Sequence, residues 1–459
     1  MHKRKQFGRK WHRVGKLIIL LAVCCSWVSL AWAADSLPVL SLHESIDMAL
    51  KKSVVIESAK EGVRITQAQN AEALTEFYPQ FNTSYGYTHT NEPPVIPIPP
   101  FPPPFNILPK EFAIEAKDSY TWSLEARQAV FAGGAIQANY RASGFGTDAA
   151  RWNQQTTILD TIQDVKMSYF SVLKAKRLLA VSKQSLEQIR THLDMAKSFF
   201  EVEIVPWNDV LQSEVEFAKA QQFVIESENA LERAQSKFNT TLRQPVDTPV
   251  NLEDILTYKP FELSLEACGK TAMENRPEIK AYRSQLAQSR EMVKVARSEY
   301  FPTISAAGHY ERRGDRPGVS GDPDFAEGQE DWHVGAVASW NFWEWGRTGD
   351  KVDAGRGRES QVSLAIEHIK DQITLQVRNQ WLQIREAVKV IAVAKKAVEQ
   401  AEENFRMVTD HYKEQVATTT DVMDAQTLLT RAKSDYENAL GDYSIAYARL
   451  ERAMGLEAY

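Results

Sequence analysis

Residues 158–200 read ILDTIQDVKMSYFSVLKAKRLLAVSKQSLEQIRTHLDMAKSFF, and an apolar side chain recurs in this stretch every seven residues. The repeating positions are Ile158, Val165, Val172, Leu179, Leu186, Leu193 and Phe200. A seven-residue repeat sustained this far is typical of long helices that pack side by side. The flanking positions hold mainly Lys, Gln, Glu, Ser and Ala. The apolar stripe is therefore narrow, and much of the helix surface faces water.

A second heptad pattern follows 212 residues later, at Lys370, Val377, Ile384, Ile391, Val398, Phe405 and Tyr412. The two patterns predict long helices over about 135–204 and 347–416. Seventy helical residues measure roughly 105 Å at about 1.5 Å per residue, which is too long for a compact domain. Shorter return helices are predicted over about 208–242 and 420–454. The turns before them offer Asn208 or Asp209, and Thr420 or Asp421, as helix caps.

Four segments change to a period of two, which predicts β-strands at about 79–90, 119–131, 302–311 and 331–343. Each strand has a polar face and a face rich in apolar and aromatic residues. Strands of this length and alternation match transmembrane β-strands, which need about 9 to 11 residues. The alternative is a soluble hairpin packed on a helix. The aromatic residues expected at the membrane interface are Tyr85, Tyr87, Tyr120, Trp122, Tyr310, Trp332 and Trp340.

The chain contains an internal repeat. Leu40-Ser41-Leu42 recurs 223 residues later as Leu263-Ser264-Leu265, and Tyr78-Pro79 recurs at the same spacing as Phe301-Pro302. These matches divide the chain into two structural repeats, 34–262 and 263–459. The repeats differ mainly by a proline-rich insertion, 91–118, for which we expect a polyproline-like arm outside the cell.

Residues 1–33 have the basic start, the apolar stretch and the small-residue end of a secretory signal peptide. A permanent anchor or lipidation of the N-terminus is the alternative. Removal of seven basic residues changes the net charge from −6 to −13, which disfavours a nucleic-acid partner. Only Cys268 would remain, so neither an intrachain disulfide nor a cysteine metal cluster is expected. The mean hydropathy of −0.38 excludes an ordinary helical membrane protein.

No enzyme site, metal site or cofactor is expected. The nine histidines are scattered, without a helical i, i+4 pair, and no convergent acid/base or nucleophile set is found. His309 and His333 flank the second hairpin loop, where solvated rim residues are a simpler interpretation than metal ligands.

Four transmembrane strands are too few to close a barrel, because open edges in lipid leave backbone groups unsatisfied. The chain must therefore oligomerise. Two, three or four copies would give 8, 12 or 16 strands, and strand counting alone does not choose among them.

The combined pattern resembles the outer-membrane efflux protein family, the TolC-like channels. The resemblance rests on the paired Leu-Ser-Leu starts, the Tyr78-Pro79 and Phe301-Pro302 strand starts, Phe131-Ala132-Gly133-Gly134, and the turns at Asp209-Val210-Leu211 and 421–425. It implies a mainly α protein with a transmembrane β-barrel: a homotrimer with a 12-stranded barrel in the outer membrane of a Gram-negative bacterium and a coiled-coil tunnel of 12 helices in the periplasm. It also implies a passive duct that docks to a periplasmic adaptor and to an inner-membrane RND or ABC-type pump, in tripartite efflux or type I secretion. The alternative function is a soluble periplasmic coiled-coil adaptor or structural protein without a membrane barrel.

The resemblance further implies a pore constriction at the periplasmic entrance, formed by Asp209, Tyr412, Asp421 and Asp424. Asp209 and Asp421 have a plainer interpretation as helix caps. The implied adaptor-docking turns consist of Val205, Pro206, Trp207, Asn208, Val416, Thr418, Thr419 and Thr420. The chain departs from the family pattern at Glu203 and Gln415, where glycine is common, and at Ala417, where arginine is common. The transported substrate is not specified by any of these residues.

Overall fold

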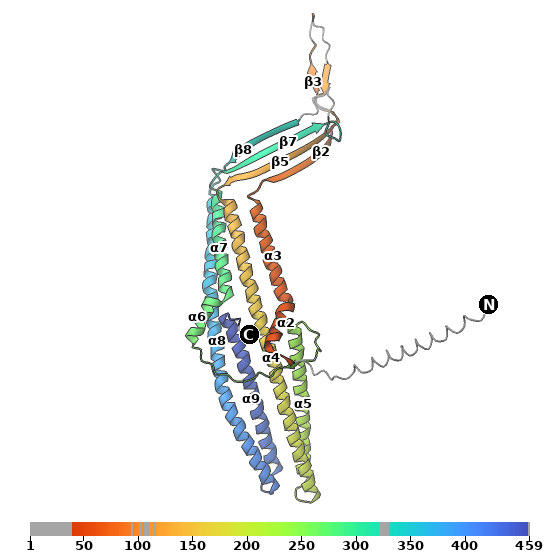
Figure 1. Cartoon of the computed structure of the whole chain (residues 1–459), viewed down its shortest axis with the longest axis vertical. Coiled ribbons are helices and arrows are strands. Elements are labelled where there is room, and N and C mark those ends of the chain that lie inside the picture. Colours follow the sequence, from red (N-terminus) through yellow and green to blue (C-terminus); the bar gives the residue numbers. More distant parts are fainter. Residues whose placement is uncertain are drawn as a thin grey trace, which may run out of the picture.

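The computed structural model describes residues 39–92, 95–100, 103–104, 110–113, 116–320 and 330–457. The molecule is elongated: a curved sheet lies at one end, long helices run away from it, and two helical hairpins form the other end (Figure 1). The predicted signal peptide lies outside the described residues.

Two very long helices form the length of the molecule. They are α4 (Ala135–Glu201) and α8 (Arg347–Lys413), of 67 residues each, or about 100 Å at a rise of about 1.5 Å. The helices that return from the lower end are α5 (Trp207–Thr241) and α9 (Thr419–Met454). Both long helices end a few residues before the predicted 204 and 416, because the turn that follows each of them contains a residue with positive φ.

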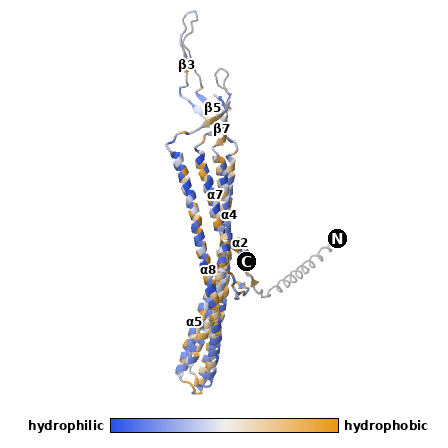
Figure 2. Ribbon diagram, turned by 90° about the vertical axis from the view of Figure 1, so that its left-hand side faces the viewer, coloured by the Kyte–Doolittle hydropathy of each residue, from blue (hydrophilic) through white to orange (hydrophobic). Residues whose placement is uncertain are grey.

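Shorter helices complete the upper half. They are α2 (Leu42–Lys52), α3 (Val54–Thr75), α6 (Leu265–Asn275) and α7 (Pro277–Ser298). In the upper half α3 packs on α4, and α7 lies between α4 and α8; in the lower half α5 packs on α4, and α9 packs on both α4 and α8. The chain is therefore a wall four helical columns wide. In the side view of Figure 2 the columns spread apart toward the sheet and lie closer together at the lower end.

Hydrophilic and hydrophobic residues are interspersed along these helices (Figure 2). Among the described residues, no helix contains an apolar stretch of the length and hydropathy that a membrane crossing requires.

The sheet consists of β2 (Gln80–His89), β5 (Asp118–Ala132), β7 (Thr303–Gly314) and β8 (Glu330–Ser339), all antiparallel, in the order β2-β5-β7-β8. This is also the spatial order of the helices connected to the strands, α3-α4-α7-α8. The last strand ends at Ser339 rather than at the predicted 343, because its partner β7 begins at Thr303, which pairs with Ser339.

The proline-rich insertion differs from its prediction. Its described part contains β3 (Val95–Ile98) and β4 (Lys110–Ala113), which pair as an antiparallel ladder and extend beyond the main sheet (Figure 1). A polyproline helix has no such backbone pairing. Pro97 fits a two-stranded ladder because each strand has one edge where an N–H is not needed.

The main hydrophobic core lies at mid-length, where α4, α5, α8 and α9 meet the short helices. Tyr169 of α4 is fully buried there, and its hydroxyl donates to the Glu253 carbonyl oxygen at 2.8 Å. The Leu40 carbonyl oxygen lies 3.2 Å from the same hydroxyl. This contact anchors the small parallel ladder of β1 (Val39–Leu40) and β6 (Asn251–Leu252) to the long helix.

Only some of the heptad residues are buried in the structure. The buried members are Val165, Val172, Leu193, Val377, Ile384, Ile391 and Tyr412. The half-buried members include Leu179, Leu186, Val398 and Phe405. Phe200, near the lower end, is 37% exposed, and its ring packs on that of Trp207 at the start of α5.

Candidate functional site

The two hairpin turns at the lower end share one backbone geometry. In each turn a backbone N–H donates to the carbonyl oxygen five residues earlier: Ile204 to Phe199 at 2.9 Å, and Val416 to His411 at 2.8 Å. Each turn places one residue in the left-handed region, Glu203 with φ 62° and Gln415 with φ 65°. Side chains with a Cβ are disfavoured there. The two positions where the chain departs from the family's glycines are therefore the strained positions of the turns.

The second turn is closed by a capping box. The backbone N–H of Thr418 donates to Asp421 Oδ2 at 2.8 Å, and the backbone N–H of Asp421 donates to Thr418 Oγ1 at 3.3 Å. The Thr418 hydroxyl also donates to Asp421 Oδ2 at 2.6 Å, and this bond, followed by that of the Thr418 backbone N–H, lowers the pKa of Asp421. The helix N-caps are Pro206 and Thr418, not the predicted residues, because α5 and α9 begin slightly earlier than expected.

Asp209 connects the two hairpins instead of capping its own helix. Thr419 Oγ1 of α9 donates to Asp209 Oδ2 at 3.0 Å and lies 3.2 Å from the hydroxyl oxygen of Tyr412 in α8. Thr419 and Tyr412 are both buried, and burial raises the pKa of Tyr412. We refer to Asp209, Tyr412 and Thr419 as the tip link, since it ties α5 to α8 and α9.

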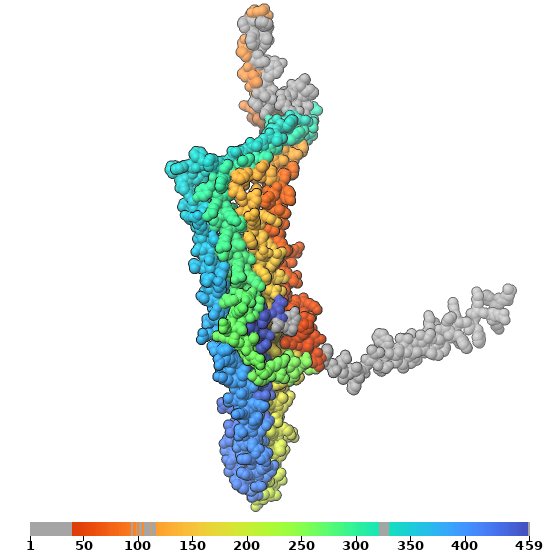
Figure 3. Space-filling model, turned by 60° about the vertical axis from the view of Figure 1, so that its left-hand side comes forward, coloured from red at the N-terminus to blue at the C-terminus, as the bar shows by residue number. Residues whose placement is uncertain are grey.

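Two further contacts join the hairpins above and beside the tip link. Gln212 Nε2 donates to Thr420 Oγ1 at 3.2 Å. Gln426 Nε2 donates to Gln188 Oε1 at 2.9 Å, and Gln426 is 2% exposed. The hairpin tips, seen side by side at the lower end in Figure 3, are thus connected by polar side chains within one chain.

Sequence reasoning missed His192, which packs against the tip link from α4. Its ring centre lies 4.7 Å from that of Tyr412. Burial lowers the pKa of His192 to about 4, and the negative charge of Asp209 opposes this shift without overcoming it. The buried Nε2 makes no hydrogen bond in the described structure. A polar residue directly before the heptad residue Leu193 was the available signal.

The predicted constriction residues divide into two sets. Asp421 and Asp424 are exposed on α9, three residues apart on one helical face. Tyr412 is 3% exposed and lies inside the chain, and Asp209 is half-buried. The structure therefore brings Asp209 and Tyr412 together through Thr419, while the two aspartates of α9 face outward.

Most of the predicted docking turn is exposed and partly apolar. Trp207 is 50% exposed and packs on Phe200 with ring centres 4.9 Å apart, and Val416 is 74% exposed. Pro206, Asn208, Thr418 and Thr420 are also exposed, Val205 is half-buried, and Thr419 is buried in the tip link.

At the opposite end, the strand register brings the predicted interface aromatics onto one face of the sheet. Ring centres lie 4.9 Å apart for Tyr87 and Tyr120 and 5.7 Å apart for Trp122 and Tyr310. Tyr85 pairs with Trp122 in the ladder, and Tyr310 pairs with Trp332. Trp340 stands apart at the helix end of the sheet, where its Nε1 donates to the Tyr300 carbonyl oxygen at 3.2 Å.

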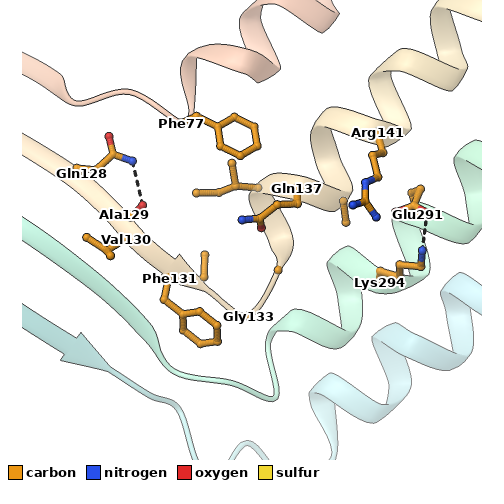
Figure 4. A pocket seen from close by; sticks show the side chains of 14 residues that line it. Phe77, Gln128, Ala129, Val130, Phe131, Gly133, Gln137, Arg141, Glu291 and Lys294 are labelled. Atoms are coloured by element: carbon orange, nitrogen blue, oxygen red, sulfur yellow. Dashed lines mark hydrogen bonds and ion pairs between the residues drawn. The ribbon is translucent and has the colours of Figure 1, made fainter.

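A pocket of about 630 Å³ lies where the sheet meets the helices (Figure 4). Gln128 and Phe131 come from β5, and Phe77 comes from the turn after α3. Arg141 of α4 and the Glu291–Lys294 ion pair of α7 line the helical side. Its polar groups do not form a nucleophile and base pair, so we assign the pocket to the junction rather than to catalysis.

Comparison with known proteins identifies the family. A family model described as "Outer membrane efflux protein" matches residues 45–242 and 269–456. The chain belongs to this family. It is 24% identical over 334 residues to nodulation protein T of Rhizobium leguminosarum bv. trifolii, covering 70% of this chain and 68% of that protein. It is also 24% identical over 332 residues to outer membrane protein TolC of Escherichia coli (strain K12), covering 70% of this chain and 66% of that protein.

Solved outer-membrane channels have the same fold. The OprN channel superposes with a TM-score of 0.74 at 16% identity, over 90% of this chain and 89% of that chain. The MtrE channel of Neisseria gonorrhoeae superposes with a TM-score of 0.72 at 18% identity, with the same coverage. The resemblance inferred from the sequence is confirmed. The protein is an outer-membrane efflux protein of a Gram-negative bacterium with a large periplasmic portion, and its relatives are channels rather than enzymes.

Proposed function

We propose that three copies of this chain form the passive exit duct of a tripartite efflux or type I secretion system. Within the described residues the outer edges of β2 and β8 have no partner strand. Unsatisfied backbone groups in lipid cost several kcal/mol each, so β8 of one copy would pair with β2 of the next. Three copies give the 12-stranded barrel that the resemblance implies.

The helical edges support the same closure. Apolar side chains are exposed on α3 at Val55 and Ile65 and on α8 at Leu364 and Leu375. Helix α3 leads into β2, and α8 follows β8. A copy whose β2 pairs with β8 of its neighbour therefore also places its α3 beside the neighbour's α8. Twelve columns would enclose a tunnel, and the exposed apolar residues would be buried in the three joints.

An internal repeat would explain how one chain supplies four columns. Three pairs of helices have equal lengths: 11 residues in α2 and α6, 22 in α3 and α7, and 67 in α4 and α8. We propose that these two repeats, 34–262 and 263–459, are each one sixth of the tube.

The constriction would lie at the lower end of the tunnel. Asp421 and Asp424 become rings of three carboxylates in a trimer, which favours cations. The tip link holds the α8–α9 hairpin against α4–α5 and so keeps the entrance narrow. Opening requires Thr419 to leave Asp209, since the two residues belong to different hairpins.

The exposed turns are the surface we assign to the periplasmic adaptor, with an inner-membrane RND or ABC-type pump beyond it. Trp207 and Val416 provide apolar contact area beside polar neighbours. Of the two, Trp207 is of a residue type that is enriched in binding hot spots.

The aromatic face of the sheet would contact outer-membrane lipid. Trp332 and Trp340 are eight residues apart, about 26 Å along a strand at about 3.3 Å per residue. With a tilt of about 40° the height is about 20 Å, near the apolar band of about 25 Å in outer-membrane barrels.

The observation that carries this proposal is a sheet whose two outer edges have no partner strand among the described residues, and whose strand order repeats the order of the helices. Its first test is the native mass of the detergent-extracted particle, for which three chains are expected. A stable, monomeric particle would refute the assembly.

The second test is conductance in planar bilayers. Asp421→Asn with Asp424→Asn removes both charges and leaves an acceptor for the capping box, so cation selectivity should fall severalfold. Asp353→Ala, an exposed carboxylate high on α8, is the control. Unchanged selectivity of the double variant would remove these aspartates from the constriction.

A further inference from the structure

A row of four side chains crosses the polar face of the sheet. The ladder pairs Asn82 with Glu125, Glu125 with His309, and His309 with His333. Residues directly opposite each other in antiparallel strands lie on the same face. The neighbouring pair Tyr310 and Trp332 points to the other, aromatic face. The row therefore places two imidazoles and a carboxylate side by side, away from the proposed lipid surface.

The distances within this row are close to those between side chains that share one metal ion. His309 Nδ1 lies 3.4 Å from Glu125 Oε1, which is long for a hydrogen bond. Two ligand atoms that are each about 2.0–2.1 Å from a tetrahedral ion lie about 3.4 Å apart. The ring centres of His309 and His333 are 5.1 Å apart. Two imidazoles bound to one such ion have ring centres separated by about 5 Å.

We propose that His309, His333 and Glu125 bind a divalent transition-metal ion such as Ni²⁺, Cu²⁺ or Zn²⁺. Imidazole and carboxylate are suitable ligands for these ions, whereas Mg²⁺ and Ca²⁺ prefer oxygen alone. Glu311 is a weaker candidate, because its Oε1 accepts a hydrogen bond from Arg313 at 3.0 Å.

The site is not assembled before the ion arrives. Among the described residues, no three or more such side chains already converge on one centre, and the two rings are tilted by 33°. The ion must turn the imidazole of His333 until a ring nitrogen points at it. His309 is 21% exposed on its side chain and Glu125 57%, so the row is open to solvent for this rearrangement. We therefore expect modest affinity, with water completing the coordination.

Binding itself needs only the sheet of one chain. Its location in the channel rests on the proposed function: in a closed barrel the polar face lines the lumen, and three copies would hold three ions at one height. A bound cation there would add positive charge to the lumen and reduce the passage of other cations.

The test uses untagged full-length protein in detergent. Cu²⁺ is added at up to one ion per chain, and electron paramagnetic resonance records the nitrogen coupling; Ni²⁺ affinity is measured by calorimetry. We expect coupling to two imidazole nitrogens and one ion per chain. His333→Ala and His309→Gln should each weaken Ni²⁺ binding at least tenfold, and Glu125→Gln should weaken it less.

His89→Ala is the matched control. His89 lies in the same sheet but on the aromatic face, where its Nδ1 contacts Asp118 Oδ1 at 2.7 Å. This variant should bind Ni²⁺ like the wild type. Coupling to fewer than two nitrogens, or unchanged affinity in folded His333→Ala, would overturn the site. Native mass and conductance are measured on the same samples. A protein that binds the ion but does not form a trimer would refute the channel proposal alone.

Discussion

Acidification should loosen the periplasmic tip through His192. In the closed tip this side chain is 5% exposed against Tyr412, and burial lowers its pKa to about 4. When the hairpins separate, His192 meets water and regains a pKa of about 6.5. Below pH 6.5 the open tip therefore binds a proton that the closed tip does not bind. The stability of the closed tip is complete above pH 6.5 and is lost progressively as the pH falls toward 4.

The size of the effect follows from the two pKa values. A difference of about 2.5 units corresponds to about 3 kcal/mol when fully expressed. Between pH 7 and pH 5 the closed tip should lose about 1.8 kcal/mol, which is roughly a 20-fold rise in the open fraction. Asp209 limits the effect, because its negative charge favours the protonated ring in the closed state.

The assay is amide hydrogen exchange over residues 195–210, normalised at each pH to the rates of the unfolded peptide. His192→Phe keeps a ring against Tyr412 but does not titrate, so its tip should open equally at both pH values. His368→Phe, an exposed position on α8, is the control and should behave like the wild type. If His192→Phe retained the full pH dependence of the wild type, His192 would not be the responsible group.

The turns and the tip link yield two further predictions. Glu203 and Gln415 both have a positive φ, which is unfavourable for a residue with a Cβ. Glu203→Gly and Gln415→Gly should therefore each stabilise the protein by about 1 kcal/mol and raise Tm. Glu187→Gly, at an exposed position inside α4, should lower stability by about 0.5–1 kcal/mol. A lower Tm in the two turn variants would contradict the strain argument. Thr419→Val removes the donor to Asp209 at a buried position. This should destabilise the closed tip by about 1–3 kcal/mol and increase the fraction of open channels in planar bilayers. Thr420→Val, at an exposed position, should have a smaller effect; equal effects of the two variants would show that the tip link does not control opening.

Much of the secondary structure could be predicted, because it depends on near neighbours. The starts of α4 and α8 match the prediction at Ala135 and Arg347, where a glycine precedes each helix. The ends could not be predicted as well, because Glu203 and Gln415 adopt a conformation that their residue types disfavour. The proline-rich segment was assigned from composition, and pairing between residues 95–98 and 110–113 took precedence over it.

The candidate sites were less predictable. The family resemblance indicated Asp209 and Tyr412, but nothing in the spacing showed that both would contact Thr419. His192 was missed because a single polar residue beside a heptad position is common on solvated helices. His309 and His333 were visible only as two histidines near a loop, and the ladder register was needed to place Glu125 beside them.

Outside the proline-rich insertion, the sequence by itself determined the types, approximate lengths and order of the long helices and the main strands, because hydrophobic period, proline and glycine act over a few residues. Tertiary structure alone decided which side chains meet across the columns and strands: Thr419 with Asp209, 210 positions away, and the row that contains His309 and His333. Such contacts depend on how helices pack and in which register strands pair. A shift of one residue in β7 or β8 would turn the side chain of His309 or His333 to the opposite face of the sheet.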